Sequence, residues 1–381
     1  MPPTNDLAVY IHWPFCVSKC PYCDFNSHEA KAVDQSRWRD ALLAELAHYH
    51  ARTPNHRVTS VFFGGGTPSL MDPATTHDLI AAATRLWPAV PDVEITLEAN
   101  PSTVEAGRFR DFRAAGVNRL SMGLQALNDD DLRFLGRPHT VAEALAALAI
   151  ARKTFDRFSF DLIYARPGQT LDGWRAELTR ALDYVGGHLS VYQLTIEDGT
   201  AFAPRHARGE FSLPDDDTLA ALFDLTQEML ERAGLPAYEI SNHARPSQEC
   251  RHNLTYWQGG DYIGVGPGAH GRIGTLATRQ HRAPDIWLER TAREGHATQE
   301  ATELAPLERA EERVMTGLRL ADGIDLAQFQ ALSGLEFADV VDRKGLAAMI
   351  EGGFITVDEA RAAPTPAGRL LLNGVTRALL G

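Results

Sequence analysis

The sequence predicts an α/β protein in which a partial (β/α)6 barrel precedes a small C-terminal unit that resembles a winged helix. Three observations carry this prediction. Hydrophobic strands alternate with amphipathic helices six times in the first half of the chain, without a hairpin signal. Polar residues and glycines recur at the end of each successive strand. From residue 305 onward the pattern becomes compact and mainly helical.

The predicted strands are short apolar runs, and the predicted helices are periodic stretches between them. Strands are expected at 7–12, 58–63, 93–98, 119–123, 158–163 and 189–194. Helices are expected at 35–49, 73–86, 104–115, 129–135, 141–155 and 171–185. Parallel strands need helical crossovers, so this alternation favours a parallel sheet with helices outside it.

The placement of polar residues favours a barrel over an open sheet. One such residue or glycine run lies at or just past the end of each predicted strand: Cys16, residues 64–67, Glu98, Gln125, Asp161 and Thr195. A barrel gathers the carboxyl ends of its strands around one mouth, whereas an open sheet spreads them along an edge. The sequence therefore predicts a single site at the mouth of a barrel.

The second half of the chain is less regular. A polar loop is expected at 198–213, a helix at 215–234, a short strand at 237–240 and an aperiodic loop or lid at 250–274. The C-terminal unit is expected to have helices at 306–320, 326–332, 337–350 and 367–379 and a strand at 354–357. These boundaries predict a barrel at 1–200, a barrel extension at 201–304 and a C-terminal domain at 305–381.

Composition limits the classes of function. The net charge of −13 argues against nucleic acid as a partner, and acidic residues outnumber basic ones in the C-terminal unit, which favours packing or partner docking over DNA reading. No apolar run approaches the roughly 20 residues that a membrane helix needs, and no membrane anchor or signal peptide is predicted. Three of the four cysteines are clustered, so we expect a reducing cytoplasm rather than disulfides.

The cysteine cluster follows the first predicted strand. Cys16, Cys20 and Cys23 have the spacing C-x3-C-x2-C, which lets three thiolates converge on one inorganic centre. Thiolates at this density select zinc or an iron–sulfur cluster. Zinc would need a fourth ligand, for which His12 and His28 are candidates, whereas a four-iron cluster would keep one iron open for a small molecule. The spacing alone leaves both alternatives.

A run of three glycines, Gly64-Gly65-Gly66, ends the second predicted strand and precedes Thr67. Glycines at this place let the backbone approach a ligand and expose N–H groups. No G-K-[ST] follows, so the run is not a P-loop. A ligand that carries an amino group and a carboxylate suits it better than a triphosphate does.

These two motifs together resemble the radical S-adenosylmethionine (SAM) superfamily. The resemblance implies that the three cysteines hold a [4Fe–4S] cluster, whose open iron chelates the amino and carboxylate groups of SAM. Further motifs are similar to oxygen-independent coproporphyrinogen III oxidase and to its relatives in the HemW family: Tyr10–Cys16 (YIHWPFC), Glu98–Pro101 (EANP), Asn118–Gln125 (NRLSMGLQ), Asp161–Tyr164 (DLIY) and Arg166–Thr170 (RPGQT).

The resemblance also implies roles for individual residues. Contacts to SAM near the cluster are expected from Tyr10, Gly65, Gly66, Thr67, Glu98 and Thr195. Tyr22 is expected near the adenine. Positions that bind SAM in the oxidase, including a second molecule, correspond to Gln125, Arg137 and Asp161.

Two departures favour the HemW family over the oxidase. Phe25 stands where the oxidase has a fourth cysteine, and the long arm that precedes the first strand of the oxidase is absent from this sequence. One positive feature agrees, because His252, Asn253, Tyr256 and Trp257 match the HNxxYW motif that the family associates with haem. The alternatives for His252 are a haem ligand and a hydrogen-bonded histidine in an aromatic core.

The function expected from this resemblance is that of a haem chaperone, which carries a [4Fe–4S] cluster and SAM and delivers haem to an acceptor protein. The acceptor is unknown, and a membrane-associated respiratory protein is one candidate. The alternative is an enzyme that decarboxylates coproporphyrinogen III, or transforms another substrate, through a 5′-deoxyadenosyl radical. Self-association remains open.

Overall fold

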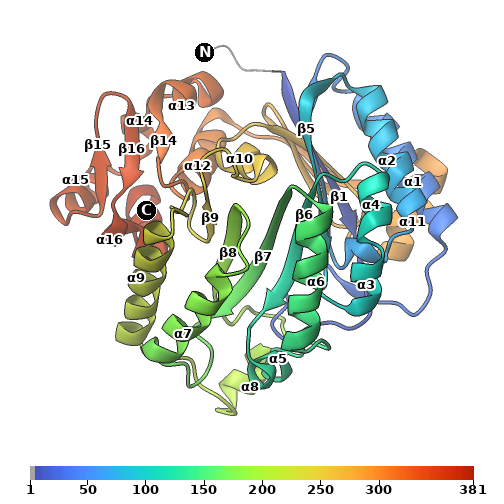
Figure 1. Ribbon diagram of the computed structural model, residues 1–381. Coiled ribbons are helices and arrows are strands. Elements are labelled where there is room, and N and C mark those ends of the chain that lie inside the picture. The colour runs from blue at the N-terminus through green and yellow to red at the C-terminus, as the bar shows by residue number, and fades with distance from the viewer. Residues whose placement is uncertain (1–4) are drawn as a thin grey trace.

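The computed structural model describes residues 5–381, apart from the side chains of residues 103 and 104 (Figure 1). Its main sheet has eleven strands in the order β13-β12-β11-β10-β1-β4-β5-β6-β7-β8-β9. The six predicted strands are all present and parallel: β1 (Asp6–Trp13), β4 (Arg57–Gly65), β5 (Ala89–Ala99), β6 (Arg119–Gln125), β7 (Arg157–Tyr164) and β8 (His188–Gln193). The predicted partial barrel is therefore confirmed.

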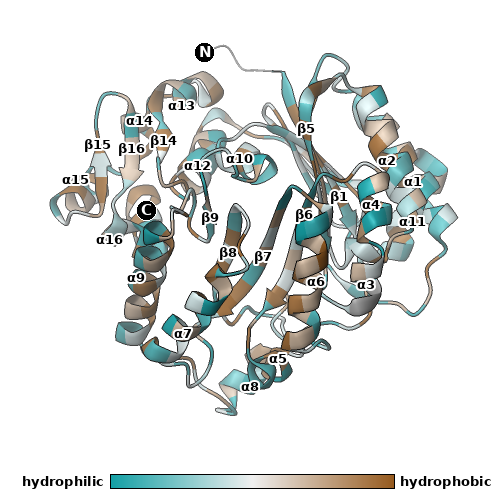
Figure 2. Cartoon of the chain, in the orientation of Figure 1, coloured by the Kyte–Doolittle hydropathy of each residue, from teal (hydrophilic) through white to brown (hydrophobic). Residues whose placement is uncertain are grey.

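The helices that follow these strands cover the outer face of the sheet, as Figure 1 shows. They are α1 (Gln35–His50), α2 (Pro73–Leu86), α4 (Phe109–Ala114), α6 (Val141–Thr154), α7 (Leu171–Leu182) and α9 (Asp216–Arg232). Polar caps start several of them: Asp34, Asp72, Thr140, Thr170 and Asp215 each accept a hydrogen bond from the first turn. Long brown stretches on β6–β8 in Figure 2 mark the apolar core between the layers.

The sheet contains a seventh parallel strand that the sequence did not predict. β10 (Asp261–Val265) pairs with β1, with Ile11 opposite Val265, inside the segment expected to be an aperiodic loop. The same segment holds α10 (Arg251–Trp257) and β11 (His270–Ile273). β10 is five residues long and bounded by glycines, so no periodic pattern could reveal it.

The remaining strands extend the sheet antiparallel to its neighbours. β11, β12 (Leu276–Gln280) and β13 (Thr298–Glu303) follow β10, and α11 (Pro284–Glu294) connects the last two. At the opposite end, β9 (Asn242–Ala244) pairs with β8. The strand expected at 237–240 is thus wrong by about four residues, and only an isolated bridge joins Ala237 to His243.

Three further predictions needed correction. The helix expected at 104–115 is split into α3 (Thr103–Gly107) and α4, since Gly107 has a low helix propensity. The polar loop at 198–213 contains α8 (Phe202–Ala207). The helix expected at 337–350 is α14 (Phe337–Val340) and α15 (Arg343–Glu351), because Asp342 caps a new helix.

The C-terminal unit has its own hydrophobic core, which includes Val314, Ile324, Phe329 and Val375. Its elements are α12 (Pro306–Gly317), β14 (Ile324–Asp325), α13 (Leu326–Ser333), α14, α15, β15 (Ile355–Val357), β16 (Arg361–Pro364), α16 (Pro366–Leu370) and α17 (Leu372–Leu380). The final helix expected at 367–379 is therefore two helices. β14, β16 and β15 form a small separate sheet, which supplies the predicted wing.

Short elements surround the mouth of the barrel. β2 (Phe15–Cys16) pairs with β3 (His28–Glu29), η1 (Pro68–Leu70) follows the glycine run, and α5 (Asp129–Phe134) follows β6. Within residues 5–381, no helix has the length and apolar character needed to cross a membrane.

Candidate functional site

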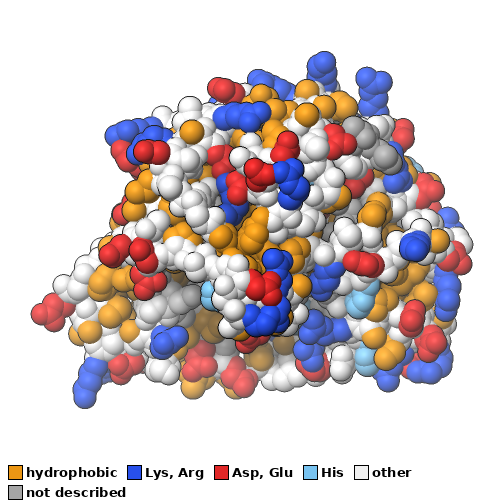
Figure 3. All heavy atoms as spheres, turned by 90° about the horizontal axis from the view of Figure 1, so that it is seen from below, with side chains coloured by type: hydrophobic (Ala, Val, Ile, Leu, Met, Phe, Trp, Pro, Cys, Tyr) orange, Lys and Arg blue, Asp and Glu red, His pale blue; other side chains and the backbone are white. Residues whose placement is uncertain are grey.

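The carboxyl ends of the parallel strands surround a cavity of about 450 Å³. Figure 3 views the molecule from this side, and apolar side chains gather near the centre of a hollowed face. Most residues predicted for the cluster and SAM line this cavity: Cys16, Cys20, Tyr22, Cys23, Gly65, Gly66, Thr67, Glu98, Gln125, Arg137 and Asp161. Seven of these eleven residues come from the strand-end argument, namely Cys16, Gly65, Gly66, Thr67, Glu98, Gln125 and Asp161, and the other four come from the cysteine spacing and the family resemblance.

The cysteine loop is held over the mouth by its own short strand pair and by two donors. The Thr67 hydroxyl donates to Cys16 Sγ at 3.3 Å, and the Arg137 guanidinium donates to Cys20 Sγ at 3.2 Å. Burial raises the pKa of the Cys16 thiol, and the Thr67 hydrogen bond partly opposes that rise. Donors aimed at sulfur stabilise thiolates, which are the form that binds metal.

The zinc alternative gains no support from the histidines. His12 Nε2 lies 2.9 Å from the carbonyl oxygen of Asn26, and His28 Nε2 lies 3.3 Å from Asn26 Oδ1. Over residues 5–381, no three His, Cys, Asp or Glu side chains are grouped closely enough to hold a single metal ion. Three thiols without a fourth protein ligand fit a cluster that keeps one iron open.

The glycine run forms a cradle at positions where the surrounding protein leaves no room for a side chain. Gly65 has a φ of +111°, and a Cβ there would lie 2.6 Å from the His12 ring. A Cβ on Gly66 would lie 2.8 Å from the carbonyl oxygen of Phe15. Both positions therefore require glycine, and the bare backbone faces the cavity beside the cysteines.

Two acidic side chains lie deep in the mouth. Burial, together with the charge of Asp161, raises the pKa of Glu98 to about 8, and burial raises the pKa of Asp161 to about 6. The backbone N–H of Gly65 donates to Glu98. Burial also raises the pKa of Tyr10, whose hydroxyl lies 3.1 Å from His12 Nδ1. A cationic ligand in this cavity would favour the ionised carboxylates.

Arg137 joins three sides of the cavity. Besides Cys20, its guanidinium donates to Asn100 Oδ1 at 2.5 Å and to the carbonyl oxygen of Gly123 at 2.8 Å. Asn100 in turn donates to the Thr67 hydroxyl at 3.2 Å. Sequence reasoning assigned no role to Asn100, although its position two residues after Glu98, at the end of a strand, was a usable signal.

Two of the predicted SAM residues differ in their surroundings. Gln125 lines the cavity with a φ of +76°, a strained conformation for a residue other than glycine, and such strain is common at functional sites. Thr195 is exposed just after β8, does not line the cavity, and donates a hydrogen bond to Glu197 at 3.0 Å.

A second cavity of about 590 Å³ adjoins the first and shares Phe25, Gly65 and Glu98 with it. It lies between the barrel, the β11–β12 hairpin and α12. Tyr256 and Trp257 of the HNxxYW segment line it, and His252 and Asn253 do not. Tyr10 also faces this second cavity, on the side of the barrel.

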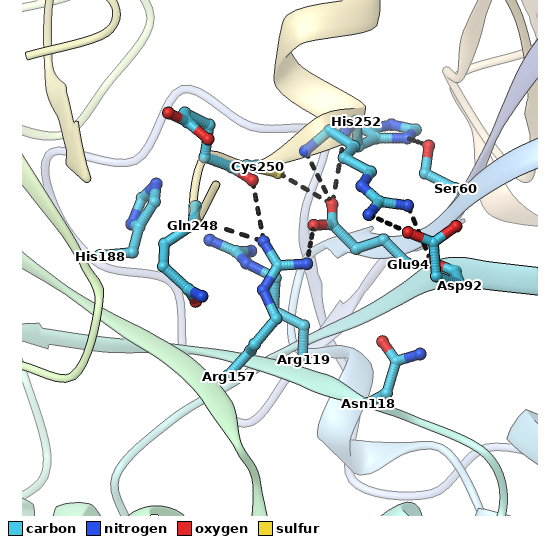
Figure 4. Close-up of polar contacts among 12 residues, drawn as sticks. Ser60, Asp92, Glu94, Asn118, Arg119, Arg157, His188, Gln248, Cys250 and His252 are labelled. Carbon is cyan, nitrogen blue, oxygen red and sulfur yellow. Dashed lines mark hydrogen bonds and ion pairs between the residues drawn. The ribbon is translucent and has the colours of Figure 1, made fainter. Parts of the chain in front are cut away.

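His252 is enclosed at the floor of the barrel (Figure 4). Its Nδ1 lies 3.1 Å from the Ser60 hydroxyl and its Nε2 lies 2.6 Å from the Tyr256 hydroxyl. The ring stacks on Phe62 at 4.9 Å, and burial lowers its pKa to about 3. His252 thus occupies the aromatic core that was the structural alternative, and it could bind iron only if one of these two hydrogen bonds were broken.

An ion-pair network closes the same floor at the amino ends of the strands (Figure 4). The Glu94 carboxylate lies 2.8 Å from Arg157 and accepts hydrogen bonds from the backbone of Arg251 and His252. Cys250 Sγ lies 3.6 Å from the same carboxylate, and burial raises the pKa of this thiol to about 12. Cys250 is therefore a protonated, buried side chain remote from the other three cysteines.

Comparison with known proteins gives the class. Residues 10–180 match the radical SAM superfamily and residues 304–371 match the HemN C-terminal domain. The heme chaperone HemW of Escherichia coli is 38% identical, over 98% of both chains. The mitochondrial radical S-adenosyl methionine domain-containing protein 1 of Danio rerio is 35% identical, over 98% of this chain and 87% of its own.

A solved structure agrees in fold. Coproporphyrinogen III oxidase (HemN) of Escherichia coli superposes with a TM-score of 0.83 and 25% identity, over 99% of this chain and 90% of its own. Fold and sequence together define a radical SAM protein with a HemN-type C-terminal domain. Within that superfamily, the chain belongs to the family that contains HemW and its mitochondrial relatives. Membership of the superfamily implies a [4Fe–4S] cluster and SAM, and the three thiols and the glycine cradle fit both.

Proposed function

We propose that this protein is a haem chaperone, which binds haem and transfers it to an acceptor protein. The observation that carries the proposal is the cavity of about 590 Å³ beside the cysteine chamber. Its size suits a large organic ligand, and its lining combines aromatic side chains with arginines. Full-length similarity to a HemW protein supports the same function.

The proposal assigns the first chamber to the resident cofactors. Cys16, Cys20 and Cys23 would hold the cluster, which when bound would supply redox chemistry and one open coordination position. The bare backbone at Gly65 and Gly66 would accommodate SAM, with Glu98 and Asp161 balancing its positive charge. Arg137 donates hydrogen bonds to Cys20 Sγ and to Asn100, and Asn100 donates to the Thr67 hydroxyl, so these contacts hold the residues around the loop.

The test uses full-length protein, purified and reconstituted without oxygen. We expect stoichiometric haem uptake, followed as a new Soret band, and transfer of that haem to an apo-acceptor such as an apo-cytochrome. Anaerobic incubation with coproporphyrinogen III and SAM should give no vinyl products. Turnover to vinyl products, or no haem uptake by the wild-type protein, would refute the chaperone proposal.

A pair of cysteine variants tests the assignment of the cluster to Cys16, Cys20 and Cys23. Cys20→Ala removes one of the three sulfurs, so we expect loss of four-iron reconstitution, measured as iron and sulfide content. Cys250→Ala removes the remote thiol at the floor and should leave iron and sulfide content unchanged. Equal iron contents in the two variants would contradict the assignment.

A further inference from the structure

His270 is a histidine on the rim of the 590 Å³ cavity, at the start of β11. Its side chain is exposed, and no hydrogen bond to its ring is found among the described residues. Partial burial, together with the charges of Arg279, its cross-strand neighbour, and of Arg272, lowers its pKa and so favours the neutral imidazole. A neutral imidazole with a free ring nitrogen is a metal ligand. His252, by contrast, is sealed behind the Tyr256 hydroxyl.

The adjoining wall of the cavity is aromatic. Tyr256 and Tyr262 pack edge to face with ring centroids 4.3 Å apart, and Trp257 lies beside them. Trp257 Nε1 is buried and has no hydrogen-bond partner among the described residues. A flat, mostly apolar ligand with polar atoms at its edge would cover these rings and satisfy this donor.

Arginines supply the third part of the cavity. Arg272 and Arg309 share the Glu312 carboxylate, so two guanidinium groups face one carboxylate. Arg272 is 8% exposed, and its buried Nη1 has no partner among the described residues. Arg282 also lines the cavity. This excess of positive charge calls for a ligand that carries carboxylates.

We infer that haem binds in this cavity with its iron on His270 and its propionates on the arginines, chiefly Arg272 and Arg282. The inference rests on the proposed function and deepens it, because it names the iron ligand and the propionate partners. Imidazole, aromatic wall and guanidinium groups together match the three chemical parts of haem: metal, macrocycle and carboxylates. The two aromatic residues of the HNxxYW segment then contact the macrocycle, while its histidine packs behind them, outside the cavity.

The iron ligand is tested with two probes, haem and metal-free protoporphyrin IX, on the full-length reconstituted protein. His270→Ala should shift the Soret band and weaken haem binding by about tenfold or more, a loss seen even when only an outer partner of a metal ligand is removed. Binding of protoporphyrin IX should stay unchanged, because that probe has no iron. His281→Ala, a histidine change in the next loop outside the cavity lining, is the matched control and should behave as wild type.

The carboxylate clamp is tested with Arg282→Gln. Loss of one charge-assisted hydrogen bond should weaken both probes alike, by about tenfold. Arg290→Gln on α11, outside the cavity lining, is the matched control. If the wild-type protein binds neither probe, the proposed function fails. If it binds both, an unchanged haem affinity in His270→Ala, or unchanged affinities in Arg282→Gln, overturns the inference alone.

Discussion

Side chains of the same residue type lie in different surroundings in this protein, and those surroundings determine their chemistry. His252 begins the HNxxYW segment and His270 follows it in sequence, yet the first has both ring nitrogens hydrogen-bonded and the second faces a cavity. The four cysteines divide in the same way, with Cys250 buried against Glu94. Residue type gives the possible chemistry, and local packing selects among the possibilities.

Glu98 gives a pH-dependent prediction at this scale. Its pKa is raised from 4.5 to about 8, so the folded protein keeps a proton that the unfolded chain loses. The stabilisation is complete below pH 4.5 and is lost as the pH rises toward 8. In urea titrations of cluster-free protein, the free energy of unfolding of wild type should fall between pH 5 and pH 8.5 relative to Glu98→Gln.

The control for this titration is Glu289→Gln, which changes an exposed carboxyl group on α11. Its free energy of unfolding should follow that of wild type across the same range. A Glu98→Gln protein that also follows wild type would show that Glu98 ionises normally in the folded state.

At the scale of elements, α10 connects the floor of the barrel to the second cavity. Glu94 on β5 accepts hydrogen bonds from two backbone N–H groups at the start of α10, and Tyr256 and Trp257 near its end line the cavity. Arg157 on β7 pairs with the same carboxylate, so three elements meet at one buried charge. The position of the aromatic wall therefore depends on a residue that touches no ligand.

Glu94→Gln should destabilise the protein by about 3 kcal/mol, because it removes the charge of a fully buried carboxylate that pairs with the partly buried Arg157. Chemical denaturation followed by circular dichroism measures this loss. Asp92→Asn is the matched control, since Asp92 pairs with Arg251 at the surface, where such a pair contributes less than about 1 kcal/mol. Equal losses of unfolding free energy in the two variants would mean that the buried pair contributes no more to stability than the surface pair does.

At the scale of the whole molecule, two hydrophobic cores are joined by polar contacts. Arg313 donates to the carbonyl oxygen of Trp257 at 2.7 Å, Arg309 donates to that of Gly259 at 2.7 Å, and Arg369 donates to that of Glu239 at 3.3 Å. The smaller core belongs to the C-terminal unit, and α15 contributes no fully buried residue to it. Arg309, Glu312 and Thr316 of α12 line the second cavity, so the position of the C-terminal unit against the barrel affects the candidate haem site.

We expect the C-terminal unit to open before the barrel, because a small core joined by polar contacts loses less free energy on opening. Native-state hydrogen exchange should show amides of α13 and α15 exchanging at a lower free energy than those of β1 and β4. Exchange of all four elements at one common free energy would show a single cooperative unit and would contradict the predicted domain boundary at residue 305.

The sequence by itself determined the six alternating strands and helices, the cysteine spacing and the glycine cradle. These features are local, because hydrophobic periodicity and short motifs are properties of neighbouring residues. The strand-end rule also predicted which residues would share the mouth, with Thr195 as the exception, since carboxyl ends of parallel strands converge by geometry.

Only the tertiary structure decided what lies beside that mouth. Three features depend on contacts between distant or irregular segments: β10 pairs with β1, His252 is enclosed, and His270, Arg282 and Tyr256 line the same cavity. No periodic pattern encodes such contacts, because they result from the packing of the whole chain around two cores.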